Sequence, residues 1–348
     1  MGENIKTTKP ARLYNITYVR VVVTLFVILF HAYAMYFYSN LDHGWTDIPY
    51  IASYKIFFIV EELVQMPLFT FISGFLFGVL YNQGRYTSFK VFLSKKVQRL
   101  IVPYILGAIF YSLVSPFSDG LITLNWFKTI GHLWFLPMLF WCFVFQYLLR
   151  NTNYLVVIIL AIFMELIKRQ IPNFFCIMGL FHFFVYFSIS FYIGKGVVKM
   201  PRNNLLLMVI AIVGSFLAII FDEALKDNTD CYISQITPIV WNYNALTKLM
   251  AHLVLTLTSL SFCVLIINFS KKIIAPPNYL FSRLDRTSLG MYIVHLPIMG
   301  FISNLSIVRT YAGEHYVLYP IFMFLFIYIV SYAFVELLLL SKLGRKIL

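Results

Sequence analysis

The sequence predicts an all-α fold, a polytopic integral membrane bundle of about ten transmembrane helices. Of its 348 residues, 61% are hydrophobic and only 12% are charged, about half the charged fraction of a water-soluble domain. The mean hydropathy is +0.82, and the apolar residues form long uninterrupted runs instead of the alternating pattern of a membrane barrel. This composition excludes an ordinary cytosolic enzyme, a disordered protein and a disulfide-stapled secreted module.

Ten apolar runs approach or exceed the roughly 20 residues that a spanning helix needs. The first is too long for a signal-peptide core and lacks a small-residue cleavage site, so we expect a retained helix. The predicted spans are 16–38, 56–81, 99–115, 132–149, 154–168, 178–198, 204–221, 247–269, 288–308 and 316–341. The turn-forming residues between them are Asn82-Gln83-Gly84, Pro116, Pro172-Asn173, Pro201 and Pro276-Pro277. No soluble insert interrupts the runs, so residues 1–348 are expected to form one membrane domain.

The basic residues predict which side of the membrane each loop faces. With ten spans and a cytoplasmic N-terminus, 20 of the 27 Lys and Arg residues fall on the inner side. Orientation follows the Lys and Arg excess, so both termini are expected in the cytoplasm. The same rule explains the net charge of +13 better than nucleic-acid binding, because the charges lie between the apolar runs and not in one patch. We expect no nucleic-acid partner.

The four cysteines give no sign of a metal or redox site, because no two of them have a Cys-x-x-Cys spacing. Cys142 and Cys263 fall inside apolar runs, whereas Cys176 and Cys231 are predicted on the outer side. A disulfide between the latter two is left open. We expect no bound metal.

The first span carries two ionisable residues on one helix face. Arg20 lies near its cytoplasmic end, and His31 follows eleven residues later, about 20° past three turns and about 16 Å further along. An ionisable group within a span is costly and is a candidate functional group. The pair suits a ligand that enters from the cytoplasm with its anionic end at Arg20. A buried, hydrogen-bonded histidine with a snorkelling arginine is the structural alternative.

Polar residues also share one face of the ninth span, where Ser288, Tyr292 and His295 recur at helical spacing. They either connect helices or contribute to a site. His132 begins the fourth span beside Trp134, in an interfacial aromatic belt or at the edge of an outer acceptor cleft.

Other ionisable residues give weaker signals. His182 and His252 lie in spans without a partner at helical spacing. Glu61 and Glu62 lie near the outer end of the second span. They either orient a hydroxyl substrate or pair with His31, or they are solvated helix-end charges. The sequence contains no Gly-rich phosphate loop, Ser-nucleophile elbow or His-Glu-x-x-His motif.

Five segments resemble, in the same order, the motifs of the membrane acyltransferase 3 family. The first is Arg20 followed after ten residues by His31, which resembles the Arg-x10-His signature of that family's first helix. The others are Met66-Pro67-Leu68-Phe69 with Ser73-Gly74, Lys95-Lys96-Val97-Gln98-Arg99 with Pro103-Tyr104, His132-Leu133-Trp134, and Ser288 to His295 followed by Pro297. Two departures concern the donor contacts: Thr17 stands where the family often has Asp, and Lys96 replaces the first Arg of an Arg-x-x-Arg element.

The resemblance implies an enzyme that moves an acyl group, commonly acetyl from acetyl-CoA, to a hydroxyl of a surface glycan, a lipid-linked sugar or a lipid. Arg20, Lys96 and Arg99 would bind the phosphates of cytoplasmic acyl-CoA. The expected location is a bacterial inner (plasma) membrane, where acyl-CoA, the acceptor and membrane lipid would be its partners.

In this scheme His31 would act as general base, since imidazole titrates near working pH. Ser73, Tyr292 and His295 would be candidates for stabilising the oxyanion. A polysaccharide or lipid-linked sugar exporter is the alternative function, because ten helices with a polar interior suit it equally. Transporters often contain inverted repeats and broken helices, and we find neither in the sequence.

Overall fold

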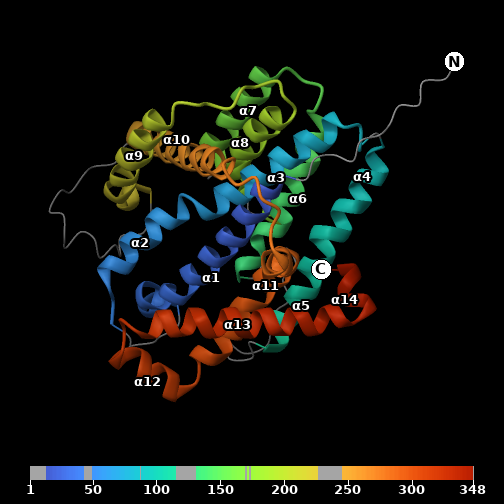
Figure 1. The fold of residues 1–348 in the computed structure, drawn as a ribbon. Coiled ribbons are helices and arrows are strands. Elements are labelled where there is room, and N and C mark those ends of the chain that lie inside the picture. The colour runs from blue at the N-terminus through green and yellow to red at the C-terminus, as the bar shows by residue number, and fades with distance from the viewer. Residues whose placement is uncertain are drawn as a thin grey trace.

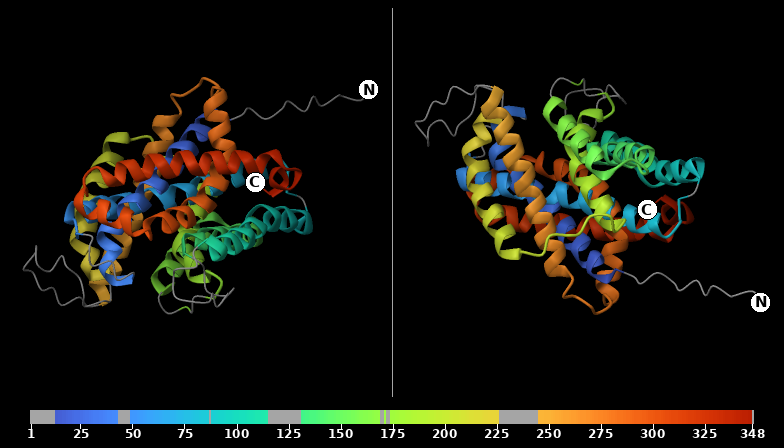
Figure 2. Two further views of the ribbon diagram at one scale, coloured as in Figure 1. Left: turned by 90° about the horizontal axis from the view of Figure 1, so that it is seen from below. Right: turned by 90° about the horizontal axis from the view of Figure 1, so that it is seen from above.

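A computed structural model describes residues 13–42, 49–86, 88–114, 131–168, 171, 174–225 and 245–347. Within these ranges the chain is built of helices joined by turns (Figure 1). Across the views of Figures 1 and 2, α9 (Asn204–Leu225) lies on the opposite side of the molecule from α4 (Phe89–Lys96). The predicted all-α membrane fold is confirmed for this part of the chain.

Seven spans in the described ranges are long and apolar enough to cross a membrane, or eight if one bent pair counts as a span. That pair is α11 (Tyr279–Ser303) and α12 (Ser306–Glu314), which meet at 88°. Two further apolar helices are shorter: α7 (Tyr154–Ile167) and the Asn204–Ile220 part of α9. Each predicted run overlaps at least one of these helices. The bounds of the ninth, 288–308, are wrong, because α11 already begins at Tyr279 and the run crosses the break at Asn304-Leu305 into α12. Ten crossings and cytoplasmic termini remain predictions.

The helix α1 (Tyr14–Asp42) lies at the centre of the fold. It packs against α11 and α13 (Tyr319–Leu340), and also against α2 (Ala52–Glu62) and α10 (Ala245–Ser270). Small and branched side chains of α1, among them Ile28 and Ala32, are fully buried in the main apolar cluster together with Val294 and Met299 of α11. In lipid, such close van der Waals packing is a principal source of helix association.

The predicted second span, 56–81, lies within one candidate membrane span, Ala52–Asn82, which consists of two helices. It is divided into α2 and α3 (Gln65–Asn82) by the two-residue turn Leu63-Val64, in which the Val64 N–H donates to the Glu61 carbonyl at 2.9 Å. Pro67 lies in the first turn of α3, where a residue without an N–H is tolerated because the helix offers that N–H no partner.

Two glycines allow α3 to pack backbone to backbone against α8 (Ile177–Gly194). A Cβ added to Gly78 would lie 2.1 Å from the Phe191 carbonyl oxygen, and one on Gly194 would lie 2.1 Å from that of Phe75. Any larger residue would force the helices apart. Small residues serve this purpose throughout membrane bundles.

The third predicted span also differs in extent. α4, the π-helix η1 (Val97–Ile101) and α5 (Val102–Val114) are continuous, so the helix begins at Phe89 and not near 99. The 3-10 helix η2 (Gly131–Trp134) leads directly into α6 (Phe135–Leu148), and the short α14 (Lys342–Ile347) follows α13.

Candidate active site

Three histidines that are far apart in the sequence meet in the interior. His31 comes from α1, His132 from η2 and His295 from α11. The ring centroids of His31 and His295 are 5.1 Å apart, those of His132 and His295 4.8 Å, and those of His31 and His132 6.1 Å. We call these three residues the histidine cluster.

The members of the histidine cluster differ in accessibility. His295 is fully buried and His132 is 5% exposed, whereas His31 is only partly buried. In the described ranges no hydrogen bond to the His31 ring is found. His31 is therefore the least buried of the three imidazole-bearing residues.

Two reciprocal hydrogen bonds hold His132 and Tyr292 together. The Nε2–H of His132 donates to the backbone carbonyl of Tyr292 at 2.7 Å, and the Tyr292 hydroxyl donates back to the carbonyl of His132. A carbonyl only accepts, so Nε2 must carry the proton and Nδ1 of the neutral ring is an acceptor. That Nδ1 is buried and has no hydrogen-bond partner among the described residues.

His295 is fixed in the same manner. Its Nδ1–H donates to the Met291 carbonyl at 3.1 Å, one helical turn earlier, which leaves Nε2 as an acceptor. That nitrogen too is buried and unbonded within the described ranges. The histidine cluster thus contains two bare acceptor nitrogens beside His31, and an N–H of His31 that bonds to either would leave its second nitrogen free as a base.

Arg20 is not an isolated cation. Its Nη2 donates to Oδ2 of Asp285 at 2.7 Å, which ties α1 to α11. A second ion pair, between Arg283 and Glu336, ties α11 to α13 through two hydrogen bonds, one of them 2.9 Å from Nε to Oε1. Any anionic ligand of Arg20 would share it with Asp285.

Lys96 lies in an aromatic box formed by Phe77, Tyr86, Phe92 and Phe143. Its Nζ is 3.3 Å from the ring centroid of Phe143 and 5.7–5.8 Å from the other three. The ammonium of Lys96 is thus held by cation–π contacts, and its binding of phosphate stays a prediction. Arg99, one turn later in η1, is exposed.

Ser73 lies on α3 and is partly buried, and within the described ranges no hydrogen bond joins it to the histidine cluster. Tyr292 is adjacent to the cluster, but its hydroxyl proton is already donated to His132. Glu61 is 5% exposed, and neither carboxylate oxygen has a hydrogen-bond partner among the described residues, so it does not pair with His31.

The sequence did not predict the surroundings of His132, or the partner shared by His182 and His252. His132 is buried in the cluster, and its position before Trp134 alone did not separate that outcome from an interfacial belt. His182 and His252 do have a common partner, Glu165 of α7, which no helical spacing could indicate because each comes from a different helix. No group of three or more His, Cys, Asp or Glu that could hold a metal occurs in the described part of the chain.

Comparison with known proteins adds one finding. Residues 13–336 match a protein family described as an acyltransferase domain. No curated protein and no solved structure matches the chain. The match covers nearly the whole sequence, including every member of the histidine cluster and both ion pairs of α11.

Proposed function

Because the chain belongs to the acyltransferase 3 family and is thus an acyltransferase, we propose that it moves an acetyl group from cytoplasmic acetyl-CoA to an acceptor hydroxyl. The acceptor would be a surface glycan, a lipid-linked sugar or a lipid. The observation that carries this proposal is the partly buried, unbonded imidazole of His31 within 5.1 Å of a second imidazole whose free nitrogen is an acceptor.

His31 is proposed as the general base. Its free nitrogen takes the proton of the acceptor hydroxyl while the hydroxyl oxygen bonds to the thioester carbonyl carbon. Collapse of the tetrahedral intermediate breaks the carbon–sulfur bond, and the thiolate takes the proton back from His31 to leave as a thiol. Atoms and charge balance without a metal or redox group.

His295 and His132 are proposed to orient His31. Each is bound through its N–H to a backbone carbonyl, so each offers an acceptor nitrogen to the His31 N–H. In the neutral form His295 has no second N–H, which weakens the expectation that it donates to the oxyanion. Tyr292 acts through His132, and Ser73 remains the candidate oxyanion donor.

The donor phosphates are proposed to bind at Arg20 and Arg99. The guanidinium of Arg20 has five N–H donors and donates one of them to Asp285, so other N–H groups can donate to a phosphate. Lys96 would reach a phosphate only by leaving its aromatic box, and we assign it to holding α4 and η1 against α6. The acyl end of the donor must then extend about 16 Å, the rise from Arg20 to His31.

A membrane location would let one protein reach both substrates, because acyl-CoA is made inside the cell and the proposed acceptors are outside. The inner membrane, cytoplasmic termini and a bacterial source belong to this proposal. They rest on the distribution of Lys and Arg residues.

The purified protein in proteoliposomes tests the proposal. With acetyl-CoA labelled in its acetyl group, thioester loss and transfer of label to an added acceptor are expected. An exporter would move a glycan and consume no thioester, so glycan transport without thioester loss contradicts the proposal. Mass spectrometry of glycans and lipids from cells with and without the gene identifies the acceptor as a missing acetyl mass.

A further inference from the structure

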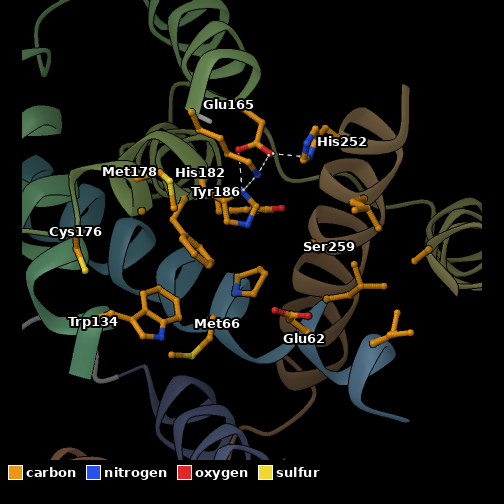
Figure 3. Close-up of a pocket in the computed structure, with 18 residues that line it drawn as sticks. Glu62, Met66, Trp134, Glu165, Cys176, Met178, His182, Tyr186, His252 and Ser259 are labelled. Atoms are coloured by element: carbon orange, nitrogen blue, oxygen red, sulfur yellow. Dashed lines mark hydrogen bonds and ion pairs between the residues drawn. The ribbon is translucent and has the colours of Figure 1, made fainter. Parts of the chain in front are cut away.

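A cavity of about 570 Å³ lies between α2, α3, α7, α8, α9 and α10 (Figure 3). This volume lies within the range of small-molecule sites, about 300–1,000 Å³. One end contains Glu165, His182 and His252, and in Figure 3 Trp134, Met66 and Glu62 lie at the other end. None of these residues takes part in the proposed acyl-transfer step.

The polar end is built around a buried carboxylate. Glu165 is 2% exposed, its Oε1 accepts from Lys168 Nζ at 2.7 Å, and its Oε2 lies 2.8 Å from Nδ1 of His182. Lys168 Nζ is also 2.9 Å from that Nδ1, and Nδ1 of His252 is 3.7 Å from Oε1. We call these four residues the Glu165 cluster. It joins the ends of α7, α8 and α10.

The charges in the Glu165 cluster argue against an anionic ligand. Lys168 already neutralises Glu165, and the two imidazoles add hydrogen-bonding atoms without a fixed charge. A second carboxylate, Glu62, lines the same cavity. Among the described lining residues, a phosphate or carboxylate would meet one lysine and two carboxylates, whereas hydroxyl groups can both donate to and accept from these side chains.

The opposite end has a flat aromatic surface, with the Glu62 carboxylate on the same side of the cavity (Figure 3). The Trp134 ring lies 5.5 Å from that of Phe183, with 33° between the ring planes, and Met66 and Leu63 line the wall nearby. A large aromatic face with a polar region opposite suits a ring that has an apolar face and hydroxyl edges. A fully apolar chain would leave the Glu165 cluster without contacts.

The cavity and the histidine cluster share a wall. Trp134 lines the cavity, and His132, two residues earlier in the same 3-10 helix, belongs to the histidine cluster. With about three residues per turn, positions two apart point in different directions, so η2 faces both places at once. A ligand seated on Trp134 is thus next to the segment that orients His31.

We infer that this cavity binds the acceptor, and that the acceptor is an uncharged sugar held on Trp134 with its hydroxyls at the Glu165 cluster. This inference rests on the proposed function, because it names the substrate that receives the acyl group. The inference predicts that the acceptor is a neutral sugar and not a lipid alcohol or an acidic sugar.

The test uses the purified full chain in proteoliposomes with acetyl-CoA. The acceptor probes are a panel of uncharged methyl hexosides, the methyl glucuronoside that matches the glucoside, and a long-chain alcohol. Acetylated products are measured by mass, and total thioester loss by free thiol. The variants are Glu165→Gln and Trp134→Leu, with Phe163→Leu as the control because Phe163 is on α7, 55% exposed and outside the cavity lining.

We expect an uncharged hexoside to be acetylated in preference to the glucuronoside and the alcohol. Both cavity variants should raise the KM for that hexoside about tenfold or more, since each loses a buried contact, while kcat at saturating acceptor changes much less. The control variant should match the wild type. A loss of kcat at unchanged acceptor KM, or preferred transfer to the alcohol or the acidic sugar, overturns the inference.

A binding measurement separates this inference from the proposed function. If the wild-type protein consumes no thioester at all, the proposed function fails, and equilibrium binding of radiolabelled methyl hexosides without donor still decides the cavity. Binding that Trp134→Leu abolishes supports the sugar site. Equal binding by the wild type and both cavity variants, or none by the wild type, contradicts it.

Discussion

Arg20 and Asp285 form an ion pair of 2.7 Å between α1 and α11, and the same two helices place His31 and His295 with ring centroids 5.1 Å apart. His31 follows Arg20 by eleven residues, and His295 follows Asp285 by ten. The two helices therefore run parallel and are joined at two heights. The rise between the contacts is about 16 Å along one helix and about 15 Å along the other.

Replacing Asp285 tests whether this ion pair prepares Arg20 for the donor. Asp285→Asn keeps the shape but loses the charge, and we expect the KM for acetyl-CoA to rise about three- to tenfold, because a charged hydrogen bond that orients the guanidinium is weakened. Initial rates at varied acetyl-CoA measure it. Glu336→Gln, which breaks the neighbouring ion pair with Arg283, is the control and should leave this KM unchanged. Equal effects of the two variants would show that Asp285 is only structural.

Removing the proposed base should stop transfer while the protein still folds. For His31→Ala we expect normal insertion and a kcat reduced about 10²- to 10⁴-fold, the usual contribution of a general base. Membrane expression measures insertion, the melting temperature measures folding, and thioester turnover measures kcat. Near-normal turnover by this variant would exclude His31 from the mechanism.

The orienting role of His295 predicts a smaller and non-additive effect. His295→Ala removes one of the two acceptors proposed for the His31 N–H, and we expect kcat to fall about 10- to 100-fold without a change in the KM for acetyl-CoA. In the double variant with His31→Ala, the loss should equal that of His31→Ala alone, since the orienting residue acts only through the base. Multiplicative losses would mean that His295 acts independently of His31.

The contact between α3 and α8 predicts a specific stability defect. Gly78→Ala places a Cβ 2.1 Å from the Phe191 carbonyl oxygen, a backbone atom, and we expect about 1–3 kcal/mol of destabilisation from overpacking. Thermal unfolding in detergent measures it. Gly300→Ala on α11 is the matched control, because nothing lies within 4 Å of its added Cβ. A melting temperature equal to that of the control would contradict the packing.

Periodicity within single helices accounts for what the sequence predicted well. The runs of apolar residues indicated the helices, and helical spacing placed Arg20 on one face with His31, and Tyr292 on one face with His295. The breaks were harder to predict. The turn at Leu63-Val64 contains no glycine or proline, so the second span appeared continuous.

Contacts between helices account for what the sequence could not predict. Asp285 as the partner of Arg20, and Glu165 as the partner of His182, are each more than ten residues away along the chain and on another helix. Helical spacing describes one helix and carries no information about the angle or height at which two helices cross. The same limit applies to Lys96, whose aromatic box draws residues from α3, α4 and α6 and from the turn at Tyr86.

The double connection between α1 and α11 constrains how the chain can change in length. Inserting or deleting a single residue between Arg20 and His31 would turn everything beyond it by about 100° and shift it by about 1.5 Å. One of the two connections would then be lost whichever helix moved, and substitutions nearby could not restore it. The number of residues in this stretch is therefore fixed by both contacts, in addition to the packing that its buried side chains such as Ile28 require.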